Sequence, residues 1–422
     1  MMVHWIWFAT RPSINERVKV HLLQQFGDPE AVYFAADSVY DGIDGLSLDG
    51  KTALQDKNLR EAEEILQKCQ RDGIQILTYQ DAAYPNRLKN IPDPPVVLYY
   101  LGRLPDFDGA PLIGVVGTRK ASAYGLGVAK RMGYQIARCG GIVVSGMAYG
   151  IDGLAMAGAL TAGAPVVGVL GCGADIVYPP SNRGLFADTR QYGCILTEFA
   201  PGTPPAAWNF PKRNRIISGL SCGVLVVEAP EKSGALITAQ QAADQGRDVF
   251  VVPGNIDVDS CIGSNRLLRD GAIAVSSGWD ILSEYEALFP DKIRRETTPV
   301  RLAGYGDEVA AVEREMTRKT QKVAQNPRTP LKKAEKKQKC NQKVIDNGAV
   351  SPYIDLDNRL QSLSPDEQTI VSCVAAGEQL VDDVIAKTGL PAGKVLAALT
   401  MLEVKGILQR LPGKRVMLKR ES

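Results

Sequence analysis

The chain has 422 residues, of which 45% are hydrophobic and 23% are charged, and its formal net charge is +2. This composition excludes a disordered or fibrous chain as a whole and is typical of a globular protein with two or three domains. No run of ~18 apolar residues is present, so we expect no membrane span. The first residues lack a basic region followed by a long apolar one, so we expect no secretory signal and predict a cytoplasmic protein.

Histidine and cysteine usage limits the chemistry that the chain can perform. The two histidines are His4 and His21, which excludes a Ser-His-Asp triad or a histidine general base in the rest of the chain. None of the eight cysteines stands in C-x-x-C spacing. Scattered cysteines are typical of a reducing compartment and argue against a zinc site or a disulfide framework. We therefore expect no metal and no cofactor.

Residues 1–80 are predicted to form a helical domain, and the chain is expected to be mostly helical up to about residue 100. Apolar residues recur at helical spacing in 14–26 and 59–69. Short helices separated by glycine-containing turns are similar to a SAM or helix-hairpin-helix bundle. A helical packing module without a binding role is the alternative, and the pattern leaves both open.

Residues 81–290 are predicted to form an extended Rossmann-like domain. Apolar runs alternate here with helical stretches, and each run is continuous rather than interrupted at every second residue. Continuous runs are expected of parallel strands that are buried on both faces, so the predicted fold class is α/β with a doubly wound parallel sheet. The expected strands are 112–116, 142–144, 166–170, 194–199, 224–227, 249–252 and 272–275.

The rest of the chain is predicted to be a linker and a second ordered domain. Residues 291–358 are poor in apolar residues, and 312–343 contain 11 basic and three acidic residues, which is typical of a flexible basic linker. This linker either adds nonspecific phosphate contacts or is a passive spacer. In 359–422 the pattern predicts a winged helix, with helices at 367–375, 381–387 and 392–405 and a hairpin of strands at 407–411 and 415–418.

Glycines and polar residues follow two of the expected strands. Gly117, Thr118 and Arg119 follow the first strand, where glycine lets another chain approach the backbone and arginine offers a fork-shaped phosphate donor. Ser145 and Gly146 follow the second strand and lead into a helix start, which favours anions. Because ligands bind outside the carboxyl ends of strands in such sheets, both groups are candidate phosphate contacts. A turn with a solvated arginine is the alternative for the first group.

A cationic cluster and a Ser-Gly pair lie farther along the chain. The cluster opens a predicted helix and consists of Lys212, Arg213, Asn214 and Arg215. Trp208 and Phe210 lie just upstream, and cations beside aromatic rings suit phosphates and stacked bases. Ser233 and Gly234 precede the next helix and form a second candidate anion site. Residues 112–282 carry 14 basic and 12 acidic residues, so we expect a focused pocket rather than a broad basic surface.

Several motifs occur in a fixed order between residues 80 and 282. They include Val-Val-Gly-Thr-Arg (115–119), Ser-Gly-Met-Ala-Tyr-Gly-Ile-Asp (145–152), Phe-Pro-Lys-Arg-Asn-Arg-Ile-Ile-Ser-Gly-Leu-Ser (210–221), Ser-Gly-Ala-Leu-Ile-Thr-Ala (233–239) and Val-Val-Pro-Gly (251–254). As a set they resemble the motifs of the DNA-processing protein A (DprA/Smf) family. The predicted helical bundle and winged helix fit family members of this length, whereas the basic linker departs from the pattern.

The resemblance implies a protein that binds single-stranded DNA, protects incoming strands in natural transformation and loads the RecA recombinase onto them. It also implies a homodimer formed through the Rossmann-like domain, and a function that needs no catalysis. By matching positions, Arg119 and the cluster at 212–215 are expected in the strand pocket. Gly117, Ser145-Gly146 and Ser233-Gly234 are expected to line it.

Two alternative interpretations are kept open. Nucleotide-hydrolysing enzymes of the lysine-decarboxylase-like phosphoribohydrolase family share the sheet, but their Pro-Gly-Gly-x-Gly-Thr turn is absent, because Pro253-Gly254 continues as Asn-Ile-Asp. We expect Asp152 to be a helix cap and Glu228 to pair with an arginine, rather than either to be catalytic. The winged helix would read duplex DNA or contact a protein. The second is favoured, because the helix at 392–405 carries few charges.

Overall fold

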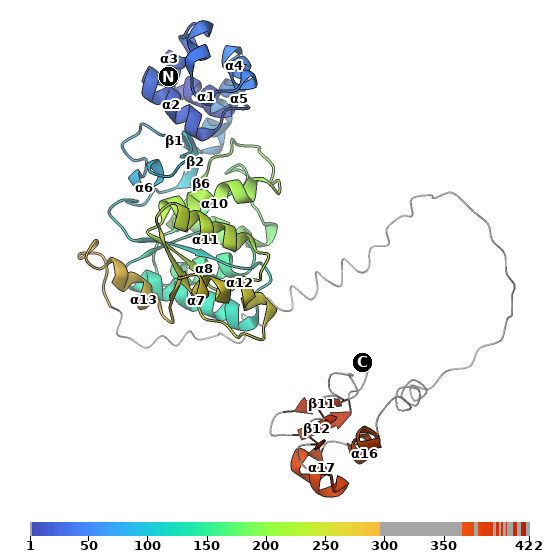
Figure 1. The fold of residues 1–422 in the computed structure, drawn as a ribbon. Coiled ribbons are helices and arrows are strands. Elements are labelled where there is room, and N and C mark those ends of the chain that lie inside the picture. Colours follow the sequence, from blue (N-terminus) through green and yellow to red (C-terminus); the bar gives the residue numbers. More distant parts are fainter. Residues whose placement is uncertain are drawn as a thin grey trace, which may run out of the picture. The chain divides into compact units, whose positions relative to one another are not determined.

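The computed structural model describes residues 2–295 and part of the C-terminal region (Figure 1). The C-terminal residues that it describes are 365–374, 379–390, 394, 395, 398, 399, 402, 408–411 and 415–418. The chain divides into two compact units, Met1–Pro327 and Arg328–Ser422, and each is described by itself. The predicted linker at 291–358 lies outside the described residues except for its first five.

Helices form the start of the first unit, as the apolar spacing predicts. The side chain of Asn15 accepts a hydrogen bond from the Val18 N–H and starts α2 (Glu16–Phe26). Gly73, in the left-handed conformation at φ 69°, ends α5 (Arg60–Asp72). The other helices are α1 (Met2–Thr10), α3 (Pro29–Phe34), a 3-10 helix (Asp37–Gly42) and α4 (Leu48–Gln55). We call residues 2–72 the helical module.

Nine strands form one sheet in the order β1-β2-β6-β5-β4-β3-β7-β8-β9. All seven predicted strands are present, and every pair among them is parallel. They are β3 (Leu112–Val116), β4 (Ile142–Ser145), β5 (Val166–Val169), β6 (Cys194–Thr197), β7 (Gly223–Val226), β8 (Asp248–Val251) and β9 (Ile273–Ala274). Every residue of β3 to β7 is buried, which explains the continuous apolar runs.

The expectation of a mostly helical chain up to about residue 100 is wrong for two strands. β1 (Gln75–Thr78) pairs antiparallel with β2 (Val97–Gly102), and β2 pairs antiparallel with β6. The sheet is therefore mixed rather than wholly parallel. The segment between β1 and β2 contains four prolines and one short helix, α6 (Asn86–Lys89), so no turn signal marks the two strands as partners. The sheet begins at Gln75, before the predicted boundary at residue 80.

Helices cover both faces of the sheet (Figure 1). On one face lie α7 (Ala123–Arg138), α8 (Ile151–Thr161), α9 (Arg183–Tyr192) and α13 (Gly278–Leu282). On the other lie α6, α10 (Asn209–Leu220), α11 (Gly234–Asp244) and α12 (Ile262–Arg269). Short 3-10 helices are Pro180–Asn182, Asp259–Cys261 and Ser283–Tyr285. Strands β4 to β6 extend from β3 in one direction and β7 to β9 in the other, so the chain reverses its order between β3 and β7.

The second unit contains the elements of the predicted winged helix. They are α16 (Pro365–Val374), β10 (Gln379–Leu380), α17 (Val381–Thr388), β11 (Leu408–Leu411) and β12 (Arg415–Leu418). The strands form one antiparallel sheet in the order β10-β12-β11. The helix predicted at 392–405 is described only in part, and its described residues Val395, Leu399 and Leu402 are buried in the core of this unit.

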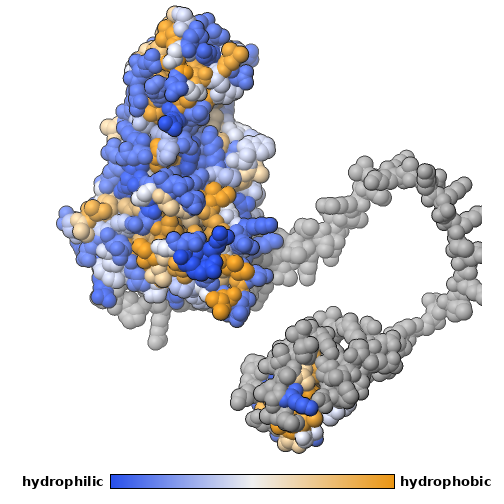
Figure 2. All heavy atoms as spheres, viewed as in Figure 1, coloured by the Kyte–Doolittle hydropathy of each residue, from blue (hydrophilic) through white to orange (hydrophobic). Residues whose placement is uncertain are grey.

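Surface character differs along the first unit. Between the helical module and the helices that cover the sheet, the face shown in Figure 2 is mostly hydrophilic. Among the described residues, no helix has the length and apolarity that a membrane crossing requires. The same residues contain no cluster of three or more side chains that could hold a metal ion.

Candidate nucleic-acid interface

A cavity of about 770 Å³ opens at the carboxyl ends of the central strands. It is lined by the loops after each of the strands β3 to β8 and by residues of α8, α10 and α11. This is the point between β3 and β7 where the strand order reverses, and open α/β sheets bind their ligands at such a point. The predicted site residues that line it are Gly117, Thr118, Arg119, Arg213, Asn214, Ser233 and Gly234.

Gly117 lets the loop after β3 pass between two neighbouring elements. A Cβ on Gly117 would lie 2.4 Å from Cγ1 of Ile151 and 2.9 Å from the carbonyl oxygen of Glu228. The next residue, Thr118, donates its N–H to that same carbonyl oxygen at 2.7 Å. The loop is therefore fixed against the start of α8 and the end of β7, and it carries Arg119 to the rim of the cavity.

Arg119 is an exposed cation beside aromatic rings. Its guanidinium carbon lies 5.0 Å from the centroid of the Phe210 ring. The Phe210 ring lies 5.5 Å from that of Tyr178, which also lines the cavity. Among the described residues, no carboxylate forms an ion pair with Arg119. A free guanidinium next to two rings can bind a phosphate while the rings stack on bases.

The start of α11 supplies backbone donors to the wall of the same cavity. The Ser233 hydroxyl oxygen accepts the N–H of Ala235 at 3.3 Å and caps the helix. Gly234 is open, since no atom would lie within 4 Å of a Cβ placed there. The Asn214 amide donates to the Gly234 carbonyl oxygen at 3.3 Å and joins α10 to α11. A helix start of this kind attracts anions.

Arg213 lines the cavity but is not a free cation. Its buried guanidinium donates to the carbonyl oxygen of Gly146 at 2.9 Å and to that of Val169. Burial lowers the pKa of Arg213 to about 10, and the neighbouring Asp152 carboxylate acts in the opposite direction. Arg213 therefore fastens α10 to the ends of β4 and β5. This differs from the predicted role of a phosphate contact.

Ser145 and Gly146 lie beneath the cavity rather than on its wall. The Ser145 hydroxyl is fully buried and donates to the Val115 carbonyl oxygen at 2.6 Å. The Gly146 N–H donates to the Asp152 carboxylate at 3.1 Å. Burial raises the pKa of Asp152, and the nearby Arg213 acts against this shift. Asp152 thus holds the loop after β4, while the N-cap position of α8 belongs to Gly150.

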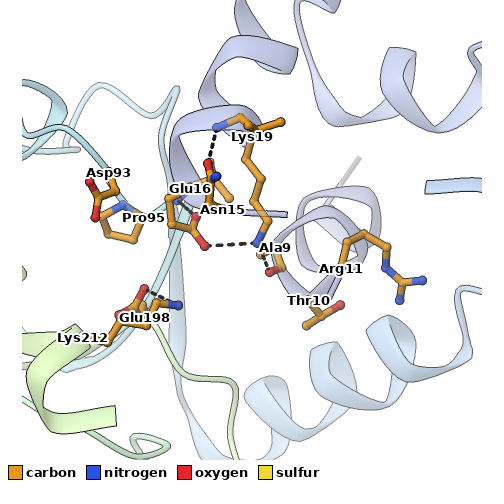
Figure 3. A network of polar contacts seen from close by, with 12 residues as sticks. Ala9, Thr10, Arg11, Asn15, Glu16, Lys19, Asp93, Pro95, Glu198 and Lys212 are labelled. Carbon is orange, nitrogen blue, oxygen red and sulfur yellow. Dashed lines mark hydrogen bonds and ion pairs between the residues drawn. The ribbon is translucent and has the colours of Figure 1, made fainter. Parts of the chain in front are cut away.

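Lys212 and Arg215 point away from the cavity, toward Glu198 (Figure 3 shows Lys212). Lys212 Nζ lies 3.3 Å from a carboxylate oxygen of Glu198, and Arg215 forms a buried ion pair with the same carboxylate. Burial raises the pKa of Glu198, and the two cations oppose that shift. The reason is helical geometry: α10 begins at Asn209, so residues 212–215 already lie within the helix. Consecutive side chains there point about 100° apart and cannot share one rim.

Glu228 also differs from its expected role. Its carboxylate accepts the N–H of Ser122 at 3.0 Å and the Ser122 hydroxyl at 2.8 Å. Ser122 in turn caps α7. The carboxylate therefore stabilises the start of a helix and forms no ion pair with an arginine among the described residues.

Sequence reasoning missed two exposed cations on the cavity wall. Lys120 and Lys232 both line the cavity, and no carboxylate pairs with either among the described residues. The only feature of the sequence that could have pointed to these two lysines is their position. Lys120 directly follows Arg119, and Lys232 directly precedes Ser233. With Arg119 they give the cavity three exposed positive charges.

The fold and the cavity define an extended Rossmann-like protein with a hollow lined by exposed cations at the switch point of its sheet, joined to a helical module and a winged helix. A family model described as DNA recombination-mediator protein A matches residues 75–286, and one described as DprA winged helix domain matches residues 356–414. The chain belongs to the DNA recombination-mediator protein A (DprA/Smf) family.

Individual relatives extend this comparison beyond the sheet. Protein Smf of Synechocystis is 34% identical over 355 residues, which span 83% of this chain and 82% of the relative. DNA processing protein DprA of Bacillus subtilis is 42% identical over 220 residues, or 52% of this chain and 74% of that protein. The X-ray structure of DprA from Streptococcus pneumoniae superposes with a TM-score of 0.60 at 31% identity, covering 67% of this chain and 98% of that one.

Proposed function

We propose that this protein binds single-stranded DNA in the cavity at the switch point and breaks no bond in it. The observation that carries the proposal is the exposed Arg119 over the Phe210 ring, in a cavity that the open start of α11 also lines. The cation and the helix start suit phosphate oxygens, and the rings suit unpaired bases. A duplex keeps its base faces stacked inside, so it offers these rings nothing to stack on.

Family membership supports a role for the bound strand in recombination. The matching family is described as a recombination mediator, and the relatives of Bacillus subtilis and Streptococcus pneumoniae are named DNA processing proteins. We infer that this protein protects incoming strands in natural transformation and loads the RecA recombinase onto them. Strand exchange by RecA on DNA coated with single-strand-binding protein tests this role, because a loader shortens the lag and a passive binder lengthens it.

We also infer that the protein acts in the cytoplasm as a homodimer formed through its Rossmann-like domain. This inference comes from the resemblance of the motif set to the family. Sedimentation of the full chain at micromolar concentration tests it: a dimer is expected, and a monomer across the concentration range contradicts it.

Binding rather than catalysis also fits the carboxylates at the switch point. Asp152 is buried and accepts the Gly146 N–H, and Glu228 accepts two hydrogen bonds from Ser122. Both carboxylates are thus engaged in holding loops. The competing function is hydrolysis of nucleoside monophosphates. An enzyme of that kind would release free base when the pure protein is incubated with these nucleotides. Full recovery of the nucleotides is the expected result.

A competition experiment tests strand preference directly. A labelled single strand is bound at near-physiological salt and is then displaced by unlabelled single strand or by a duplex of the same sequence. The unpaired competitor is expected to displace the label at a much lower concentration. Equal displacement by the duplex would mean that the cavity does not read unpaired bases.

A further inference from the structure

A second hollow, of about 620 Å³, lies where the helical module meets the segment between β1 and β2. We call it the module groove. Its walls come from α2, from the turn at Gly45 and from the residues around α6. The residues used below are Arg17, His21, Asp44, Tyr79 and Lys89. The groove shares no lining residue with the cavity at the switch point.

Arg17 differs from the other cations of the helical module, all of whose residues the structure describes, because it is exposed and unpaired. It is exposed on the first turn of α2, and no carboxylate pairs with it there. The half-buried Lys57 lies over the rings of Trp7, Tyr33 and Tyr40. The remaining lysines and arginines of the module all form ion pairs, namely Arg11, Lys19, Lys51, Arg60, Lys68 and Arg71.

Lys89, the last residue of α6, also lines the groove. Its Nζ lies 5.5 Å from the centroid of the Tyr79 ring, which also lines the groove, and no carboxylate pairs with it among the described residues. A cation on an aromatic ring is the arrangement that Arg119 and Phe210 form in the cavity. The exposed imidazole of His21 adds a donor, and Asp44 is the carboxylate on the wall. Permanent positive charges thus outnumber negative ones.

Helix α10 contributes to the cavity wall and also contacts the segment that lines the groove. Phe210 and Arg213 of α10 line the cavity. From the same helix, Arg215 Nε lies 3.8 Å from Asp93, which stands between two prolines of the groove wall. Figure 3 shows two ion pairs of this region, that of Lys212 with Glu198 and that of Lys19 with Glu16 on α2. The Arg215–Asp93 ion pair thus links the helix that lines the cavity to the segment that lines the groove.

We propose that the module groove is a second phosphate site, which holds the backbone of a strand whose other part lies in the cavity. This inference rests on the proposed function of the cavity. Arg17 and Lys89 line the groove from different elements, so each can neutralise one phosphate of a backbone that lies in it. The expected ligand is therefore a phosphodiester chain.

The test compares strands of two lengths on the full-length protein. The double variant Arg17→Ala/Lys89→Ala is matched by Arg131→Ala/Arg190→Ala, which removes two exposed arginines outside both hollows. Fluorescence anisotropy measures oligothymidylates of about 5 and about 25 nucleotides, lengths chosen around the ~4–16 nucleotides of a typical single-strand site. The double variant is expected to weaken only the long strand, by about tenfold. Its slope of log affinity against log salt should fall by about 1.4, or 0.7 for each of two phosphates.

The outcomes separate this inference from the function on which it rests. If Arg17→Ala/Lys89→Ala melts like the control and binds the long strand with unchanged affinity and salt slope, the groove is not a phosphate site. Loss of long-strand affinity in both double variants alike would lead to the same conclusion. Binding of thymidine monophosphate that depends on Arg17 and Lys89, with long strands unaffected, would assign the groove to free nucleotides instead. If Arg119→Ala fails to weaken the short strand, the cavity proposal itself fails.

Discussion

Arg119 and Arg213 stand at the same cavity with different surroundings. Arg119 is exposed, and its neighbour is the face of an aromatic ring. Arg213 is buried, and its guanidinium donates hydrogen bonds to backbone carbonyl oxygens. A cation with free donors can bind a phosphate, whereas a cation with satisfied donors holds structure. The two arginines should therefore respond differently to the same substitution.

Replacing Arg213 is expected to act on folding. In Arg213→Ala the carbonyl oxygens of Gly146 and Val169 lose a buried donor, and a void remains. The free energy of unfolding should fall by about 2–4 kcal/mol. Arg119→Ala, at an exposed position, should stay within about 0.5 kcal/mol of the parent protein. Urea unfolding measures both variants, and equal stabilities would contradict the positioning role.

Two glycines of the cavity offer a second matched pair. In Gly117→Ala the new methyl group would meet Ile151 Cγ1 and the Glu228 carbonyl oxygen at under 3 Å. We expect a loss of about 1–3 kcal/mol in unfolding free energy, since the backbone must shift to relieve such contacts. Gly234→Ala enters open space at a helix start and should cost less than about 0.5 kcal/mol. Thermal melts that rank the two variants in the reverse order would refute this geometry.

Helix α10 is the element that organises the site. One of its faces meets the cavity through Phe210 and Arg213, and another meets Glu198 through Lys212 and Arg215. Glu198 and Arg215 are both buried. Removing one partner of a buried ion pair leaves an uncompensated charge, which costs more than the pair itself contributes.

Glu198→Ala should therefore be strongly destabilising, by about 3–5 kcal/mol. The remaining carboxylate near Arg215 is that of Asp93, at 3.8 Å. Adding Arg215→Met should recover much of the loss, because the buried charge is then gone and an apolar side chain fills its place. Chemical unfolding of the parent, single and double variants checks this. A double variant no more stable than Glu198→Ala would show that α10 does not depend on the pair.

Some elements of the fold follow directly from the sequence pattern, and others do not. The parallel strands were predictable within about two residues, because burial on both faces leaves a continuous apolar run. β1 and β2 were not, since β1 is a four-residue edge strand whose partner follows a proline-rich segment. The directions of Lys212, Arg213 and Arg215 were not predictable either. They depend on where α10 begins: the pattern places the cluster at the start of the helix, whereas α10 begins at Asn209 and the cluster lies within it.

On the scale of the whole molecule, the cavity and the module groove both belong to the first compact unit. A chain ending at residue 358 should therefore keep the single-strand affinity of the full protein within about threefold, or 0.7 kcal/mol. Its duplex binding should also persist if the winged helix contacts a protein rather than DNA. Gel-shift titrations of both chains on both ligands check this. A large loss of single-strand affinity would place part of the site in the second unit.

Strand binding in the cavity should depend most directly on Arg119 as a phosphate contact. The decisive measurement is the affinity of Arg119→Ala for a single strand over a series of salt concentrations, with Arg131→Ala as the control. We predict an affinity about tenfold weaker, a salt slope reduced by about 0.7, and a strand recovered intact. Unchanged affinity and slope in Arg119→Ala, or an equal loss in Arg131→Ala, would contradict the account.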